Sequence, residues 1–318
     1  MKILITGGSG FIGSALCKSL ALYYDITGTY HENAPPSVKI PWVQVDLLEP
    51  EDVAALIETA RPDVIVHAAG LKQGGLLKRN ERECLRVNGL ATERLCTWAA
   101  QANPRVLFIY LSSVSVYGIR RDVKPFREED PCYPTETNGI SKLFGEERLR
   151  YLIEKQILKD VLIFRLAPCY DKTWTRNLER RIMIPGQMSY IRYGSGEQKM
   201  SALARGNVIN AIGHVLKNRG DFEGFQIFNL CDRRPYSFNE LMKVIQLSGI
   251  LPHRPVFTLP TPLVNFFSLG MPGGAVGKLS MLNTYQAKVF RDMTYDSGKL
   301  IEKGVNPVHT LETVFLKS

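Results

Sequence analysis

Three glycines near the start of the chain have the spacing of a phosphate-binding turn. Gly7, Gly10 and Gly13 form a GxxGxxG pattern between an apolar run and a helical pattern. Glycine allows the tight turn and the close approach of a pyrophosphate, and the following helix offers free N–H groups. Glycine turns also serve purely structural ends, but this flanking context favours a bound dinucleotide. We expect the cofactor to contact these residues of the turn: Gly7, Ser9, Gly10, Phe11, Ile12 and Gly13.

The residues at the ends of the second and third predicted strands help to decide whether NAD or NADP binds. An acid at the end of the second strand would hold the ribose hydroxyls of NAD. Here Glu32 comes only after His31, and His31 or Lys39 could instead meet the 2′-phosphate of NADP. The sequence leaves NAD and NADP open, with a slight preference for NADP. Asp46 and Leu47 could hold an adenine ring through a carboxylate and an N–H, and Asp46 could also cap a helix.

The elements that would position these residues follow from the apolar pattern. Short apolar runs predict strands buried on both faces, at residues 2–6, 26–30, 42–45, 63–67, 106–112 and 161–166. Helical spacing separates them, at residues 12–20, 53–60, 81–101 and 138–157. Strands joined through helices predict an α/β fold with a doubly wound, Rossmann-type parallel sheet.

The pattern becomes irregular after Pro168. Prolines, glycines and aromatic residues increase there, and only a strand at 226–230 and a helix at 237–248 stand out. We therefore predict a dinucleotide-binding domain at 1–168 and a smaller, mainly substrate-binding C-terminal lobe at 169–318. The segment Gln226–Leu230 is expected to return to the main sheet.

The composition excludes several classes of protein. The 318 residues carry a formal charge of +9, but lysines and arginines form no block of five, which argues against a nucleic-acid partner. A basic surface or a phosphate-bearing small molecule explains the charge instead. The six cysteines and five histidines are scattered, which predicts no metal site and reduced thiols in the cytoplasm. No signal-like segment or membrane span is predicted, because the apolar stretch 256–271 is short and interrupted by prolines.

Further motifs make the chain similar to a known family. His67–Gly70 follows the fourth predicted strand and Ser112–Gly118 the fifth, and Pro134–Leu143 and Phe228–Leu230 come later. In order and spacing these motifs resemble the extended short-chain dehydrogenase/reductases, which are nucleotide-sugar epimerases, dehydratases and reductases. The resemblance covers essentially the whole chain and is sharper over residues 1–170. It implies further cofactor contacts from Ala68, Ala69, Gly70 and Pro168.

The resemblance also implies a catalytic set with one departure. In that family a Ser or Thr polarises the sugar oxygen, a Tyr transfers the proton, and a Lys four residues later holds the nicotinamide ribose. Ser113 and Lys142 match the first and last of these, but Asn138 stands at the tyrosine position. A carboxamide has no titratable proton near neutral pH, and loss of a general acid or base costs about 10²–10⁴ in rate.

Three interpretations of Asn138 remain open. Another residue supplies the proton, with Tyr117 and Tyr133 nearby in sequence and Cys132 and Cys169 at strand ends. Alternatively, the reaction needs no tyrosinate. In the third interpretation the chain binds the dinucleotide without turnover, as a regulatory or scaffold protein. The first two predict an NAD(P)-dependent nucleotide-sugar epimerase, dehydratase or reductase with an atypical site.

The family pattern implies residues for the substrate as well. A basic patch follows the sixth strand, and a glycine loop later carries a lysine that would approach a diphosphate. We expect four residues to contact a nucleoside-diphosphate sugar: Asn177, Arg181, Lys199 and Arg291. Asn88 matches a family asparagine that holds backbone near the site, although it could also be a surface residue. Family members pair through two helices, which implies a homodimer through residues 84–101 and 138–157.

Overall fold

A seven-stranded parallel sheet forms the centre of the computed structural model, which describes residues 1–71, 81–120, 124–183, 189–260 and 291–316. The strands lie in the order β11-β6-β5-β4-β1-β2-β3. Their bounds are Lys2–Thr6 (β1), Asp25–Tyr30 (β2), Trp42–Gln44 (β3), Val64–His67 (β4), Leu107–Ser113 (β5), Asp160–Leu166 (β6) and Phe225–Leu230 (β11). This order confirms the predicted doubly wound Rossmann-type sheet. It reverses between β1 and β4, where such sheets bind ligands beyond the carboxyl ends of their strands.

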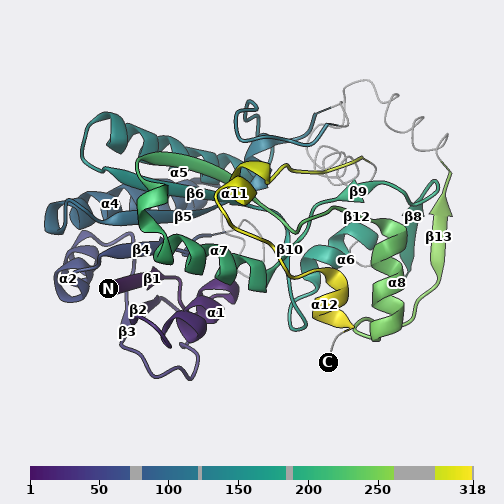
Figure 1. Ribbon diagram of the computed structural model, residues 1–318, viewed down its shortest axis with the longest axis horizontal. Coiled ribbons are helices and arrows are strands. Elements are labelled where there is room, and N and C mark those ends of the chain that lie inside the picture. The colour runs from purple at the N-terminus through teal and green to yellow at the C-terminus, as the bar shows by residue number, and fades with distance from the viewer. Residues whose placement is uncertain (72–80, 121–123, 184–188, 261–290, 317–318) are drawn as a thin grey trace.

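Helices cover both faces of the sheet (Figure 1). The helices α1 (Phe11–Leu20) and α7 (Arg205–Lys217) share one apolar core with the sheet, and α2 (Pro50–Ala60), α4 (Ala91–Ala102) and α5 (Thr137–Glu154) share the other. Successive side chains of a strand point to opposite faces of the sheet. In β1, Ile3 and Ile5 therefore belong to the first core and Leu4 to the second.

The helix predicted over residues 81–101 is not regular. It begins as α3 (Glu81–Leu85), passes through a π-helical turn at Arg86–Leu90, and continues as α4. Such π-turns are frequent at functional sites. This one contains Asn88, which it brings into the interior.

The C-terminal lobe has an apolar core of its own. Its described residues include the helices α6 (Arg176–Ile182), α8 (Phe238–Ser248) and α12 (Leu311–Phe315). They also form three short strand pairs: β7 (Cys169–Tyr170) with β10 (Leu203–Ala204), β9 (Lys199–Met200) with β12 (Tyr236–Ser237), and β8 (Tyr190–Tyr193) with β13 (Val256–Leu259). Figure 1 shows the lobe at one end of the molecule, beyond the carboxyl ends of the strands.

The buried carboxylate of Asp232 ties the lobe together. It accepts hydrogen bonds from the hydroxyls of Tyr170 (2.6 Å) and Tyr236 (3.0 Å) and from the N–H of Ala204 (2.8 Å). Burial raises the pKa of Asp232 to about 6. These bonds join β7, β10 and β12, which are distant in sequence.

The chain leaves the main sheet and returns to it. Helix α7 packs on α1, and β11 pairs in parallel with β6 from Phe225 opposite Val161 to Leu230 opposite Leu166. The short helix α11 (Gly298–Glu302) contacts β11. None of the described helices is long and apolar enough to cross a membrane.

Candidate active site

The glycine turn is packed too tightly for side chains. Gly7 has a φ of +67°, and a Cβ built on it would lie 2.6 Å from the backbone nitrogen of Ala69. A Cβ on Gly13 would lie 2.1 Å from the carbonyl oxygen of Gly7. The N–H of Gly8 donates to Thr29 O (2.7 Å), which fixes the turn against β2. The glycines therefore let helix α1 begin directly against the ends of β1 and β4.

The start of α1 suits the pyrophosphate of a dinucleotide. Gly10 is the N-cap and offers no side chain to the first helical N–H groups. Those groups have no carbonyl partner within the helix and carry a partial positive charge. The crowded glycines and this open helix start fit an NAD-type cofactor.

His31 lies between two carboxylates at the end of β2. Its Nδ1 is 3.8 Å from Glu32 Oε1, and its Nε2 is 3.7 Å from Asp46 Oδ2. The other oxygen of Asp46 accepts the N–H of Leu48 at 2.9 Å, so Asp46 caps a turn while it faces His31. Leu47, next to it, is buried.

Three polar side chains are linked at the carboxyl end of β5. Asn138 Nδ2 donates to Ser115 Oγ (2.8 Å), and Ser115 Oγ donates to Ser113 Oγ (2.9 Å). The N–H of Ser115 also donates to Ser113 Oγ (3.2 Å). Ser113 therefore accepts two hydrogen bonds and keeps its own proton for another acceptor. The sequence did not single out Ser115, whose position in the 3₁₀ turn Val114–Tyr117 creates the link.

Lys142 brings a positive charge to the same corner. Its Nζ donates to Leu111 O (2.8 Å) on β5 and lies 4.6 Å from the centre of the Tyr110 ring. A Cβ on Gly70 would lie 3.1 Å from Lys142 Nζ and 2.9 Å from Asn88 Oδ1. Gly70 thus allows the end of β4 to approach the lysine, so two motifs far apart in sequence meet here.

Asn88 holds the backbone of the site, and the alternative of a surface residue is wrong. It is fully buried. Its Oδ1 accepts the N–H of Leu71 and its Nδ2 donates to Leu71 O, both at 2.8 Å. Nδ2 also lies 2.9 Å from Ser141 Oγ, to which it donates. Asn88 therefore connects the segment after β4 with the helix of Lys142.

Tyr117 is built into the core rather than into the cleft. It is 2% exposed, and its hydroxyl donates to Asn229 Oδ1 at 2.7 Å. Its ring stacks on Phe126 with centroids 4.9 Å apart, and the Arg165 guanidinium lies 4.8 Å from the ring centre. Burial raises the pKa of Tyr117 well above its ordinary value. These contacts argue against Tyr117 as the proton donor and make it a structural support.

The two cysteines offered as proton donors are also unfavourably placed. Cys169 is buried, and its thiol points to Ala167 O at 3.5 Å. Burial raises the pKa of Cys132. Tyr133, in contrast, is 72% exposed.

Among the described residues, no three His, Cys, Asp or Glu side chains gather as a metal site.

A buried ion pair supports the end of β5 from behind. Arg165 NH2 and Glu146 Oε2 lie 2.7 Å apart, and both side chains are about 5% exposed. The hydroxyl of Ser112 donates to Glu146 Oε1 at 2.5 Å. This pair fixes Ser112, the residue next to Ser113. Its two partners lie 19 residues apart, one on a helix and one on a strand, so the sequence shows no pattern that would predict the pair.

Three predicted substrate residues meet in the lobe. The buried Arg181 donates through NH2 to Arg291 O (2.8 Å) and Lys199 O (3.3 Å). It thereby holds the backbones of two exposed basic residues close together. Asn177 Nδ2 donates to Cys169 O (2.7 Å), and Pro168 O accepts the N–H of Leu203 (3.1 Å). Both contacts order the connection from β6 into the lobe.

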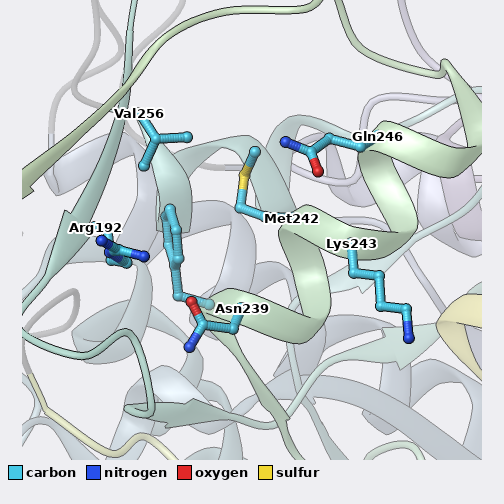
Figure 2. A pocket seen from close by; sticks show the side chains of 7 residues that line it. Arg192, Asn239, Met242, Lys243, Gln246 and Val256 are labelled. Atoms are coloured by element: carbon cyan, nitrogen blue, oxygen red, sulfur yellow. The ribbon is translucent and has the colours of Figure 1, made fainter.

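A separate cavity of about 280 Å³ lies in the lobe between α8 and the pair β8–β13. Figure 2 shows Asn239, Met242, Lys243 and Gln246 reaching it from α8, with Arg192 and Val256 opposite. None of the predicted site residues lines it. We therefore place the candidate active site at the carboxyl edge of the sheet.

Comparisons with known proteins identify the family of the chain. The dTDP-4-dehydrorhamnose reductase of Burkholderia thailandensis is 34% identical over 148 residues, which are 46% of this chain and 44% of the reductase. The methionine adenosyltransferase 2 subunit beta of Danio rerio is 28% identical over 165 residues, 51% of this chain and 48% of that protein. The chain thus spans about half the length of these curated relatives.

A solved structure extends the likeness to the whole fold. The UDP-glucuronic acid 4-epimerase of Bacillus cereus, in complex with UDP-glucuronic acid and NAD, has a TM-score of 0.72 at 19% identity and covers 99% of this chain and 97% of its own. The model of the NAD dependent epimerase/dehydratase family matches residues 3–231, which include the glycine turn, Ser113 and Lys142. The chain therefore belongs to the NAD dependent epimerase/dehydratase family.

Proposed function

We propose that this chain is an NAD-dependent enzyme that modifies the sugar of a nucleoside-diphosphate sugar. The observation that carries the proposal is the meeting of Ser113 and Lys142 at one edge of the sheet, beside a glycine turn that fits a dinucleotide. Lys199 and Arg291, whose backbones Arg181 holds together, would supply cations for the diphosphate. Epimerisation, dehydration and ketone reduction are all known among its relatives, and the fold alone does not choose between them.

We favour NAD over the NADP that the sequence slightly preferred. The carboxylates of Glu32 and Asp46 flank His31 at the end of β2, where the adenine ribose is expected. A 2′-phosphate placed there would meet two negative charges, whereas ribose hydroxyls could donate to them. We expect NADH to bind more tightly than NADPH in a fluorescence titration. Tighter binding of NADPH would reverse this assignment.

When bound, the nicotinamide would supply reversible hydride transfer. The protein's own contribution centres on Ser113, because a hydroxyl that accepts two hydrogen bonds becomes a stronger donor. Its proton is directed to the substrate oxygen, and the Lys142 ammonium adds a positive charge near the same edge. Such preorganised donors stabilise negative charge that develops on oxygen.

We propose that Asn138 occupies the place of the family tyrosine. The support is its position four residues before Lys142 and its hydrogen bond towards Ser113 through Ser115. Asn138 can orient Ser113 through this chain, but it cannot exchange a proton near neutral pH. Any proton transfer then depends on water or on another side chain, of which the exposed Tyr133 is the remaining candidate from the sequence.

A second function is favoured by Asn138 itself. A chain that binds the dinucleotide without turnover could serve as a regulatory or scaffold subunit. One relative, the methionine adenosyltransferase 2 subunit beta, is named as a subunit of another enzyme. This alternative requires the cofactor turn and the fold but no proton donor.

One experiment separates the two functions. Proton NMR of the purified protein with a panel of nucleotide sugars, and with NAD(H) and NADP(H) supplied separately, tests for conversion. Conversion of any sugar establishes an enzyme and names its reaction. Cofactor binding without conversion across the panel favours the subunit.

The variant Asn138→Tyr sharpens this test. An increase in turnover with unchanged cofactor affinity would indicate a site that lacks only its proton donor. A decrease would indicate that the carboxamide itself has a role.

We also propose a cytoplasmic homodimer that pairs through α4 and α5. Both helices carry exposed aromatic side chains, Trp98 and Tyr151, and the exposed Leu90 lies just before α4. None of the six cysteines forms a disulfide, which fits a reducing compartment. Light scattering after gel filtration should give twice the mass of one chain, and Trp98→Glu should reduce it to one.

A further inference from the structure

A turn of the lobe reaches back to the cofactor turn. The residues between β7 and α6 form this turn, which two backbone hydrogen bonds between Asp171 and Trp174 close (3.1 and 3.2 Å). Thr173 adds two more by donating its N–H and its hydroxyl to Asp171 Oδ1, both at 2.7 Å. The turn is therefore held in one shape although it lies at the surface.

Trp174 stacks on the first residue of α1. The ring centroids of Trp174 and Phe11 are 5.4 Å apart, with 26° between the planes. Phe11 belongs to the glycine turn, at the helix start where the pyrophosphate is expected. The contact thus joins the lobe to the cofactor site across more than 160 residues of sequence.

Arg205 fastens the same contact from the start of α7. It donates to Phe11 O (3.1 Å), its guanidinium lies 4.6 Å from the Phe11 ring centre, and it forms an ion pair with Asp171. The pairing of β7 with β10 sets Ala204 opposite Tyr170, which brings Arg205 and Asp171 together. Two residues of separate elements, Trp174 and Arg205, therefore hold Phe11, and Asp171 holds Arg205.

We infer that Trp174 retains the bound dinucleotide by closing over the start of α1. This inference rests on the proposed function, because it requires a dinucleotide at the glycine turn. With Phe11 held by Trp174 and Arg205, the pyrophosphate leaves the helix start only when the stack opens. Arg176, exposed and 5.8 Å from the Trp174 ring centre, adds a cation at the same place. Trp174 is thus a positioning residue for the cofactor, and its removal speeds cofactor release.

The rate of NADH release tests this role directly. Bound NADH is displaced by excess NAD⁺ in a stopped-flow instrument, and the loss of NADH fluorescence gives the rate without any substrate. Trp174→Ala is expected to release NADH about tenfold faster, because an aromatic pair contributes on the order of a tenfold change in equilibrium. Trp174→Phe keeps a stacking ring and should release NADH at close to the original rate.

Phe257→Ala is the control. Phe257 is also an exposed aromatic residue of the lobe, 60% exposed on β13, and it has no part in the Phe11 contact. Trp174→Leu, which keeps apolar cover without an aromatic ring, replaces Trp174→Ala if that protein does not fold. Equal release rates for the Trp174 variant and the Phe257→Ala control overturn the inference, although NADH binding would still support the proposed function. If the unmodified protein binds no NADH, both are overturned.

Discussion

Two neighbouring regions at the carboxyl edge of the sheet are held by different kinds of contact. We call residues 6–13 and 67–70, where we propose that the cofactor binds, the cofactor edge. Residues 113–117 and 138–142, where we propose that the chemistry takes place, are called the catalytic corner. At the cofactor edge the backbone itself is packed so closely that a single added carbon on Gly13 would collide with Gly7. At the catalytic corner a chain of side-chain hydrogen bonds runs from Asn138 through Ser115 to Ser113.

This difference explains how the chemistry can change while the fold persists. Replacement of a glycine at the cofactor edge disturbs backbone that two strands and a helix share. Replacement of one polar side chain at the catalytic corner alters a hydrogen bond whose net contribution is about 1 kcal/mol. The presence of Asn138 at the corner is therefore compatible with an intact cofactor edge.

The largest effect on cofactor binding is expected from Gly13→Ala. The new Cβ would lie 2.1 Å from Gly7 O, and this backbone atom cannot move without displacing the turn. We expect NADH binding to weaken by about 100-fold or more, since overpacking of a tight site costs about 3 kcal/mol. Fluorescence titration measures the affinity, and thermal unfolding reports the stability.

Gly213→Ala is the matched control for this glycine. Gly213 lies within α7, and a Cβ built there meets nothing within 4 Å. It should stabilise the protein by about 0.5–1 kcal/mol, the usual gain when alanine replaces a helical glycine. Equal NADH affinities of the two variants would contradict the tight packing of the cofactor edge.

The cofactor edge was also the part that the sequence predicted best. Strand β1 spans Lys2–Thr6 as predicted, because its apolar centre Ile3–Ile5 marks a strand buried on both faces. Helix α7 was missed, although Val208, Ala211 and Val215 recur at helical spacing. It contains two glycines and two asparagines, which weaken the helical pattern, and its burial against α1 compensates for them.

The catalytic corner was predicted only in part. Ser113 and Lys142 were identified through a family resemblance, but the bridging role of Ser115 depends on a 3₁₀ turn that brings it within 2.8 Å of Asn138. Residues 23 positions apart leave no local pattern for such a bond. The exclusion of Tyr117 required its burial to be known, because in sequence it lies as close to Ser113 as any candidate donor.

The largest effect on the free energy of unfolding is expected behind the catalytic corner. Glu146→Gln leaves Arg165 buried without its carboxylate, and breaking a buried pair costs about 3–5 kcal/mol. Because Ser112 donates to the same carboxylate, the end of β5 should also lose order. Urea unfolding measures the loss.

Helix α5 provides the control for that variant. Arg148, two residues after Glu146, forms a bidentate pair with Glu93 on α4, and these side chains are 31% and 24% exposed. Glu93→Gln should cost at most about 1 kcal/mol, since partly exposed pairs contribute little. Similar losses for the two variants would mean that burial of the Glu146 pair has no energetic consequence.

A smaller effect is expected from pH, through His67 at the cofactor edge. The Thr92 hydroxyl donates its proton to Asn88 O, so it accepts a hydrogen bond from His67 Nε2 (3.0 Å). His67 Nδ1 therefore accepts the hydrogen bond of the Thr6 hydroxyl (2.6 Å). Burial, with the nearby Lys142 charge, lowers the pKa of His67 to about 3. His67 therefore stays neutral in the folded protein, whereas in the unfolded chain it binds a proton below about pH 6.5. Because only the unfolded state gains this proton, the free energy of unfolding falls as the pH is lowered.

The expected loss from His67 is about 2 kcal/mol between pH 7 and pH 5. The free energy of unfolding, measured with urea, should fall between pH 7 and pH 5 by about 2 kcal/mol less in His67→Asn than in the unmodified protein. The raised pKa of Asp232 acts in the opposite direction, but it is common to both proteins and cancels in their difference. The exposed His253→Asn is the control, and an equal decline in His67→Asn and the unmodified protein would argue against a buried neutral His67.

The smallest effect is expected at the catalytic corner itself. Ser115→Ala removes the donor to Ser113 and the acceptor of Asn138, at a cost of about 1 kcal/mol in unfolding free energy. NADH affinity should stay unchanged, because the glycine turn does not depend on this chain of bonds. Asn138→Ala should cost about as much, and the double variant should cost less than the sum, since both changes break the same bond. Additive costs with a weakened NADH affinity would mean that the corner and the cofactor edge are one structural unit, and the Asn138 carboxamide would then serve the fold rather than Ser113.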